Sequence, residues 1–275
     1  MPLPHAACWL VPLVLAAAVP VRPVEAATLL HLGARARFAA TPVLRVAAIS
    51  AGSEAATHVV PEVTYHHDTY QGAPAQIAPG SRHDWRFSLP PPAAPGTYAV
   101  TIRVRYRDAR GDQRMIPAVT LLSTPGAAPG VVAASLSATP TTGVSTVRLV
   151  LDNRGPRPVG GRVTTVLPSE LHTEPETRPV ELPVGASRVV PVSLMWRDSS
   201  AHDLRPVWAL FEYRQAGVFH AIAARVDVAR PPDTWHRHVP LVVVTVALVS
   251  ALAILGVAWR AVTARATREQ FSGRS

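Results

Sequence analysis

Short runs of alternating apolar and polar residues, separated by Pro or Gly clusters, fill residues 28–230. This period of two is typical of half-buried β-strands, because successive side chains of a strand point to opposite faces. The clearest run is Thr97–Tyr106, and a turn then leads into Met115–Leu122 as the second strand of a predicted hairpin. One face of the first strand carries Tyr98, Val100, Ile102, Val104 and Tyr106. We therefore expect this whole region to be all-β.

A second hairpin is predicted near the end of the region, where Val218–Val228 returns after a turn at residues 215–217. Tyr106–Gly111 resembles Tyr213–Gly217, and Pro79–Arg82 resembles Gly185–Arg188. The offset is about 105 residues in both cases, the length of one immunoglobulin-like β-sandwich. The sequence thus predicts two tandem Ig-like β-sandwich domains, residues 28–123 and 131–230, with the boundary in Ser123–Gly130. Two such domains in line would extend roughly 70–80 Å.

The alternation stops at Val239–Trp259, a run of about twenty residues without a charge. At about 1.5 Å per helical residue this run spans roughly 30 Å, which predicts a transmembrane helix. Trp235 and Trp259 are expected as interfacial anchors, and Arg260 opens a basic tail, 260–275, on the cytoplasmic side.

The other apolar run, Trp9–Val19, is too short to span comfortably and is followed by small residues that fit a signal-peptidase site. Residues 1–26 are therefore predicted to be a signal peptide cleaved after Ala26 or Ala27, with an uncleaved N-terminal anchor as the alternative. Together the two runs predict a single-pass protein of the cell (inner) membrane. Its N-terminus lies outside, in the periplasmic or extracellular space, and its C-terminus lies in the cytoplasm.

The composition limits the partners and the site chemistry that the chain can have. The 27 basic residues are all arginine, and the formal net charge is +9. A positive balance favours anionic surfaces such as lipid headgroups or acidic glycans, while nucleic acid is a poor partner for an exoplasmic region. The single cysteine, Cys8, falls in the predicted leader. The mature chain would then lack disulfides, thiol nucleophiles and thiolate metal ligands.

The second half resembles the bacterial CARDB-like Ig-fold modules over roughly residues 132–228. The resemblance rests on a strand that ends in Asn-x-Gly at Val147–Gly155, a strand that ends in Pro at Val163–Pro168, and a Pro-x-Gly turn. That turn ends the segment Val180–Gly185 and precedes the strand Val189–Leu194. The resemblance implies adhesion, scaffolding or presentation of other domains, generally without catalysis.

Histidines are densest around residues 58–83. His66, His67, His58 and His83 are candidate ligands of copper or zinc, because imidazole suits both metals. Neighbouring residues on a strand point to opposite faces, however, so His66 and His67 could not both bind one metal without a kink. The alternative is that these histidines have no metal role.

Arginines gather on the first hairpin. Guanidinium groups could bind carboxylates or phosphates in a bidentate manner there, and the alternative is a solvated outer face. The candidate binding residues are Arg103, Arg105, Arg107, Arg110 and Arg114.

The sequence holds no motif that predicts an enzyme or a cofactor. The leading hypothesis is a membrane-anchored, non-catalytic binding or scaffold protein, an accessory subunit of a cell-envelope complex whose partner is another envelope protein or an anionic glycan. The rival hypothesis is a periplasmic metal-handling or redox accessory protein that uses the histidine-rich region.

Overall fold

The computed structural model describes residues 28–38, 41–140, 145–197 and 204–229, and every regular element in these ranges is a β-strand. The prediction of an all-β region is confirmed: the strands form four antiparallel sheets. No helix in the described ranges is long and apolar enough to cross a membrane. The predicted leader 1–26, the anchor 239–259 with Trp235, Trp259 and Arg260, and the tail 260–275 lie outside these ranges.

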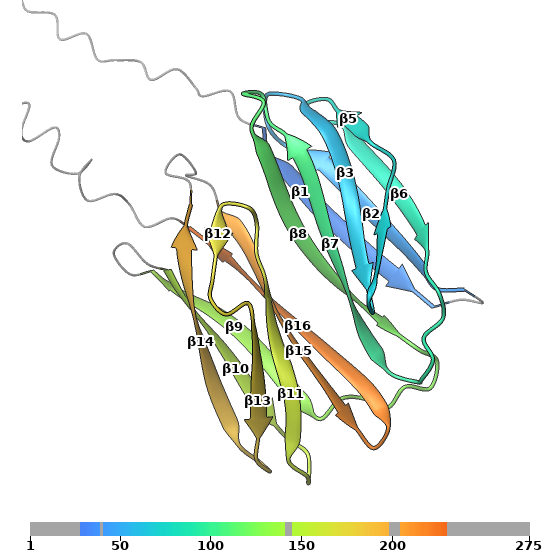
Figure 1. The fold of residues 1–275 in the computed structure, drawn as a ribbon, viewed down its shortest axis with the longest axis vertical. Helices are drawn as coiled ribbons and strands as arrows, with labels where there is room; N and C mark the ends of the chain where they lie inside the picture. Colours follow the sequence, from blue (N-terminus) through green and yellow to red (C-terminus); the bar gives the residue numbers. More distant parts are fainter. Residues whose placement is uncertain (1–27, 39–40, 141–144, 198–203, 230–275) are drawn as a thin grey trace, which may run out of the picture.

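The first half of the chain forms a β-sandwich (Figure 1). One sheet has the order β1-β2-β6, and the other has the order β4-β3-β7-β8, with β5 paired to β3. The strands are β1 (Leu30–Arg37), β2 (Val43–Ser50), β3 (Ala56–Tyr65), β4 (Asp68–Gln71), β5 (Ala75–Ile77), β6 (Arg82–Ser88), β7 (Thr97–Arg107) and β8 (Gln113–Ser123).

The second half repeats this arrangement. Its sheets have the orders β12-β14-β10-β9 and β13-β11-β15-β16. The strands are β9 (Val132–Pro140), β10 (Ser145–Asn153), β11 (Val159–Val166), β12 (Leu171–His172), β13 (Thr177–Leu182), β14 (Ser187–Trp196), β15 (Arg205–Gln215) and β16 (Val218–Val228). The order of β9, β10 and β14 matches that of β1, β2 and β6, and the order of β13, β11, β15 and β16 matches that of β4, β3, β7 and β8. This is the Ig-like type of sandwich, with antiparallel sheets that enclose one core.

Alternation along the strands fills both cores. In β7 the inward positions Tyr98 to Tyr106 are all at most 5% exposed. The Tyr98 hydroxyl donates a hydrogen bond to the Ala94 carbonyl, 2.6 Å away and four residues upstream. This contact is the tyrosine corner that fixes the chain where it enters this strand of an Ig-like sandwich. Tyr106 and Tyr213 are both buried near the ends of the corresponding strands β7 and β15.

Asn153 gives the Asn-x-Gly sequence a structural role. Its side chain is buried, and its Nδ2 donates to the carbonyls of Arg157, Leu182 and Pro183 at 2.9–3.2 Å. Its Oδ1 accepts from the Gly155 amide at 3.0 Å. One amide group therefore ties the β10–β11 turn to the β13–β14 turn and satisfies buried backbone groups.

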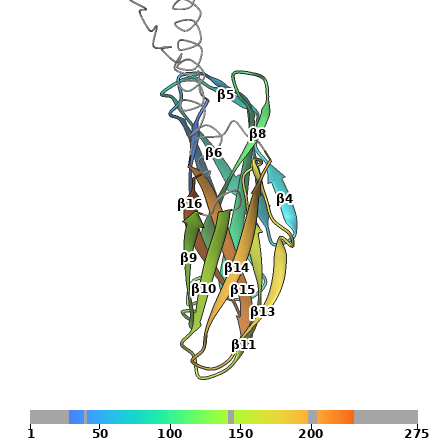
Figure 2. The same ribbon diagram turned by 90° about the vertical axis from the view of Figure 1, so that its left-hand side faces the viewer.

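The two sandwiches pack side by side, with the sheet that contains β7 and β8 against the sheet that contains β15 and β16 (Figures 1 and 2). The in-line arrangement expected from the sequence is therefore wrong. The reason lies in the outward faces of these sheets, where Val119, Val166 and Leu210 are buried against one another. Burying this apolar surface between the halves removes it from water, and end-to-end sandwiches would leave it exposed.

Candidate binding cleft between the two sandwiches

Backbone and aromatic contacts fix one end of the interface between the sandwiches. Gly96 and Phe219 form a parallel β-bridge, and the Phe219 ring stacks on the Tyr98 ring with centroids 4.8 Å apart. A Cβ atom on Gly96 would lie 2.3 Å from the Phe219 carbonyl oxygen. Only glycine allows this close approach, because no Cβ atom fits at that distance.

A buried ionic network fixes the other end. Glu170, before β12, is 3% exposed, and its carboxylate lies 3.2 Å from Nε of Arg205 and 3.9 Å from Nη1 of Arg114. Arg114 comes from β8 of the first half and also contacts Asp108 at 3.0 Å. Backbone contacts reinforce the junction, because the Met115 amide donates to Ser169 Oγ at 3.0 Å. The charges are mutually compensated, as buried charges must be.

A cleft of about 830 Å³ opens between these two fixed ends. Thr101 and Arg103 of β7 line one wall, and Gly160, Arg162 and Glu212 of β11 and β15 line the facing wall. The remaining lining includes the β3–β4 turn with His66 and His67, the aromatic rings of Tyr98, Tyr213 and Phe219, and Arg214. The cleft thus combines a sheet wall from each sandwich with both charged and aromatic groups.

Glu212 carries the cleft's carboxylate. Burial raises its pKa above the ordinary value, and the nearby positive charge of Arg162 and the neighbouring His67 oppose this shift. Arg162 and Glu212 face each other across β11 and β15. A carboxylate at this depth favours a hydrogen-bond donor or a cation as its neighbour, because a bound partner would compensate the desolvated charge. Arg103, Arg162 and Arg214 leave the cleft net positive beside this acid.

Of the five candidate arginines of the first hairpin, Arg103, Arg105 and Arg114 line one hollow of about 440 Å³, and Arg107 and Arg110 do not line it. Arg103, Arg105 and Arg107 alternate with the core residues of β7 as expected, whereas Arg114 of β8 lies opposite the core residue Tyr106. Arg103 lines the cleft, Arg105 forms an ion pair with Glu62 at 2.7 Å, and Arg114 lies in the buried network. Arg107 and Arg110 are exposed at the end of the hairpin.

The candidate histidines lie at separate places. His66 and His67 line the cleft from the β3–β4 turn, where His66 adopts a positive φ of 56° and packs on Tyr65 and Tyr98. Burial lowers the pKa of His66. His58 lies at the bulge in β3, and His83 of the other sheet packs on Trp85 at 4.5 Å. Within the described ranges, no group of three or more His, Cys, Asp or Glu residues could hold a metal ion.

The facing wall of the cleft was not anticipated from the sequence. Its residues come from β11 and β15, which face β7 only because the sandwiches lie side by side. The available signal was the unbroken apolar run Val207–Phe211, in which outward Leu210 is as buried as its inward neighbours. A run without alternation indicates a strand that is covered on both faces.

Comparisons with known proteins do not assign the chain to a family. No family model matches the sequence, and no curated protein matches it. Among solved structures, Salmonella alpha-2-macroglobulin is 13% identical with a TM-score of 0.32, and the match covers 75% of this chain and 16% of that chain. Red sea bream transglutaminase is 12% identical with a TM-score of 0.26, covering 70% and 31%. A Porphyromonas gingivalis protein of unknown function is 13% identical with a TM-score of 0.25, covering 72% and 99%. The chain thus spans about one sixth of the macroglobulin, and likeness at this level carries no functional argument.

Proposed function

We propose that the protein is a membrane-anchored, non-enzymatic binding protein of the cell envelope that holds a segment of a partner protein in the cleft between its sandwiches. The observation that carries this proposal is the cleft itself, about 830 Å³ between two sheets that are fixed to each other at both ends. A preformed site binds with little loss of conformational entropy on the protein side. In this arrangement the predicted anchor would hold the site at the outer surface of the membrane.

The lining indicates the chemistry of the partner segment. Arg103, Arg162 and Arg214 would pair with Asp or Glu side chains of the partner, and Glu212 would accept a hydrogen bond from its backbone or from a basic side chain. Phe219, which stacks on Tyr98, offers apolar contact at the end of the cleft beside the Gly96–Phe219 bridge. An extended, predominantly acidic segment with an aromatic or apolar residue satisfies all three groups.

Site-specific photo-crosslinking of the full-length protein in native membranes tests the proposal. Gly160 lines the cleft and has no atom within 4 Å of a built Cβ, so a photoreactive phenylalanine analogue fits there. Val184, 55% exposed in the β13–β14 turn, is the matched control position. We expect one adduct of defined mass from position 160 and none from position 184, and Arg103→Ser should reduce that adduct. Equal labelling from both positions would refute a cleft-bound partner.

Membrane anchoring is tested separately. Alkaline extraction should leave the protein in the membrane fraction, because the predicted helix 239–259 would lie in the bilayer. Protease added from the outer side should degrade the sandwiches and protect the tail 260–275. Release by alkali, or protection of the sandwiches, would contradict the proposed topology.

A further inference from the structure

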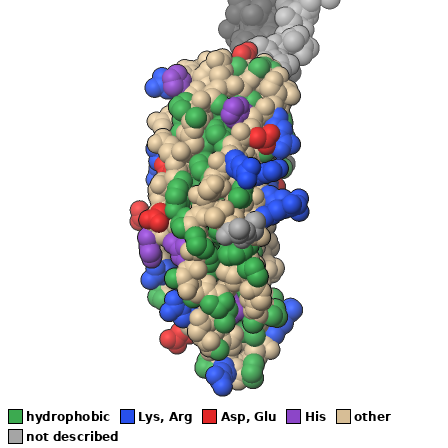
Figure 3. Space-filling view, turned by 90° about the vertical axis from the view of Figure 1, so that its right-hand side faces the viewer, with side chains coloured by type: hydrophobic (Ala, Val, Ile, Leu, Met, Phe, Trp, Pro, Cys, Tyr) green, Lys and Arg blue, Asp and Glu red, His purple; other side chains and the backbone are tan. Residues whose placement is uncertain are grey.

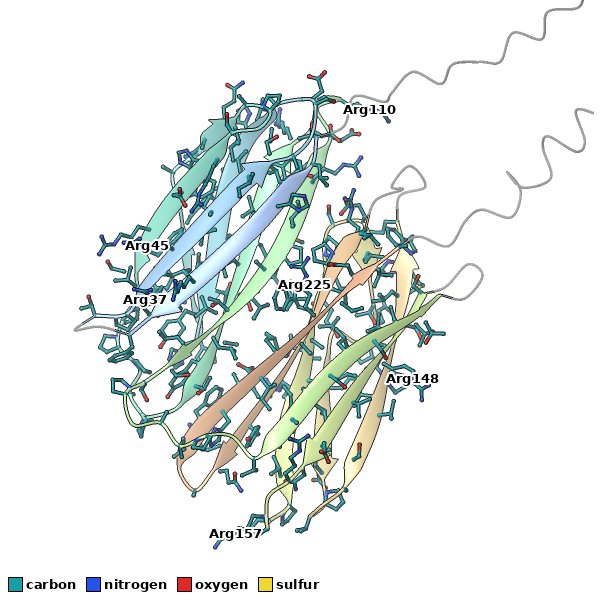
Figure 4. The ribbon with its side chains drawn as sticks, turned by 180° about the vertical axis from the view of Figure 1, so that it is seen from behind. Arg37, Arg45, Arg110, Arg148, Arg157 and Arg225 are labelled. Carbon is teal, nitrogen blue, oxygen red and sulfur yellow. The ribbon has the colours of Figure 1, made fainter. Side chains whose placement is uncertain are left out.

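The outer sheet of the first sandwich carries a row of arginines that the cleft does not use. Arg35 of β1 lies directly opposite Arg45 of β2, and Arg45 lies directly opposite Arg86 of β6. All three side chains are exposed, and Arg37 lies two residues along β1 on the same face. Residues directly opposite each other on paired strands have Cβ atoms about 4.5–5.5 Å apart, so the three arginines form one continuous row across the sheet. Figure 3 shows basic side chains gathered on this side of the molecule, and Figure 4 shows Arg37 and Arg45 close together at its edge.

Such a row opposes folding. Like charges that face each other across paired strands destabilise a sheet, and here the central Arg45 has a like charge on both sides. The three strands contain a single carboxylate, Asp84, which forms an ion pair with Arg82 at 2.6 Å. In the described ranges, Asp84 pairs with Arg82 and not with the row, although the charge of Arg45 helps to lower the pKa of the Asp84 carboxyl group. An external anion would therefore relieve the repulsion.

Two hollows flank the row. One, of about 670 Å³, has small residues Gly33 and Ala47 at its floor, and it is lined by Ile49, Arg82 and Asp84 as well as by the row. The other, of about 230 Å³, lies toward Arg37 and Val43. The hollows share Arg35, Arg45 and Arg86, so a ligand that occupies both must pass over the row.

We propose that the outer face of the β1-β2-β6 sheet binds a linear acidic glycan whose sugar rings sit in the two hollows and whose carboxylates pair with Arg35, Arg45 and Arg86. Guanidinium groups bind carboxylates in a bidentate geometry, which gives the contact direction as well as charge. The hollows favour separate rings over a lipid surface, because a bilayer is flat and is bound through protruding apolar side chains. Among the described residues of β1, β2 and β6, Ile49, 40% exposed, is the one large apolar side chain that is exposed, and a single such residue offers little surface for insertion into a bilayer.

The proposal is independent of the cleft. The face and the cleft share no residue and lie on opposite sides of the first sandwich. The protein would then hold a partner segment on one side and an envelope polysaccharide on the other.

Binding of oligogalacturonate, which carries one carboxylate per sugar, to the full-length protein in nonionic detergent tests the site. Arg45→Ser is the test variant, because it removes the centre of the row. Arg148→Ser is the matched control, because Arg148 is exposed in the corresponding strand β10 but faces the uncharged residues Ser137 and Pro191 (Figure 4). We expect Arg45→Ser to weaken binding about 10-fold, a typical effect of removing one charge-assisted pair. Arg148→Ser should leave binding unchanged.

Thermal unfolding supplies a second readout that does not depend on the chosen glycan. At low salt Arg45→Ser should raise Tm by about 1–4 °C, since it removes two like-charge contacts, whereas Arg148→Ser should not. Oligogalacturonate should raise the Tm of the unmodified protein more than that of Arg45→Ser, because the variant binds it about 10-fold more weakly. The cleft variant Gly160→Trp should bind the glycan normally, which separates failure of this site from failure of the cleft.

Four results would overturn the proposal. Equal binding by Arg45→Ser and the unmodified protein would mean that the arginine row does not take part in glycan binding. Equal binding of a neutral maltooligosaccharide would mean that the site does not recognise the charge of the glycan. Equal protection by inorganic phosphate at matched ionic strength would mean a site for small anions only. Binding to phosphatidylglycerol vesicles without binding to oligogalacturonate would mean a membrane-facing surface instead.

Discussion

Replacement of Glu170 by Gln should destabilise the protein far more than loss of an exposed ion pair. The substitution keeps the shape of the side chain and removes its charge, so it isolates the electrostatic contribution. The Glu170 side chain is 3% exposed, and the Arg205 and Arg114 side chains that it pairs with are 13% and 16% exposed. Without the carboxylate, two largely desolvated guanidinium groups would lose a shared negative neighbour.

The magnitude follows from these exposures. Removing one partner of a fully buried ion pair typically costs about 3–5 kcal/mol. Arg114 keeps Asp108 at 3.0 Å, and both arginines retain some contact with water. We therefore expect a loss of about 2–3 kcal/mol in the free energy of unfolding, just below that range. Asp227→Asn is the control, because the Arg225–Asp227 pair is 46% and 42% exposed and should contribute at most about 1 kcal/mol.

Urea unfolding of the full-length protein in nonionic detergent measures both changes. The m-value of Asp227→Asn should equal that of the unmodified protein. Glu170→Gln should also loosen the junction between the sandwiches, since Arg114 belongs to the first half and Glu170 to the second. If its unfolding then broadens into two steps, the loss is the sum over both steps. A double-mutant cycle should give a larger coupling for Glu170 with Arg205, at 3.2 Å, than for Glu170 with Arg114, at 3.9 Å. If Glu170→Gln costs no more than Asp227→Asn, the network does not stabilise the junction.

Three further predictions concern single positions. Gly161→Ala should lower the free energy of unfolding by about 1–3 kcal/mol, because the new Cβ would lie 2.5 Å from the Glu212 carbonyl oxygen. Gly160→Ala should lower it by less than about 1 kcal/mol, because no atom lies within 4 Å of a Cβ built there. Urea unfolding of both variants checks this contrast. Burial raises the pKa of Tyr106 from 10.0 to about 12. Its contribution to stability is therefore present below pH 10, and about 2–3 kcal/mol should be lost as the pH rises through 12. Tyr106→Phe should abolish that part of the loss in unfolding curves measured at alkaline pH. Burial lowers the pKa of His220, so the contribution of its neutral imidazole to stability is present above pH 6.5 and is lost as the pH falls below that value. His220→Phe should flatten the decline in the free energy of unfolding between pH 7 and 5. An unchanged decline would mean that His220 does not cause it.

Period-two patterning predicted the strands well, because it depends on contacts within one sandwich. The run Thr97–Tyr106 lies within β7, and its apolar positions are buried as expected. The packing of one sandwich on the other depends on contacts between distant strands, so no local period reveals it. Leu210 shows the difference: it interrupts the alternation of β15 because a second surface covers it.

The candidate sites were predicted in part for the same reason. Arg103, His66 and His67 do line one cleft, although Arg103 was a candidate for anion binding and the two histidines were candidates for metal binding. Arg114 differs because its partner Glu170 is more than fifty residues away, and only the side-by-side packing brings them together. The Arg35–Arg45–Arg86 row depends on strand register, which the separate segments of sequence do not specify.

The apolar contact between the two sandwiches also limits how this gene can change. Modules that fold alone can be duplicated, reordered or transferred between chains, because each brings its own complete surface. Here the second half would carry Leu210 and Val166 into water if it were separated, and the first half would carry Val119. Exposed apolar patches of this kind promote aggregation. The pair should therefore be inherited as one unit, and recombination should be tolerated before β1 or after β16, away from the Thr124–Val131 connection between the halves.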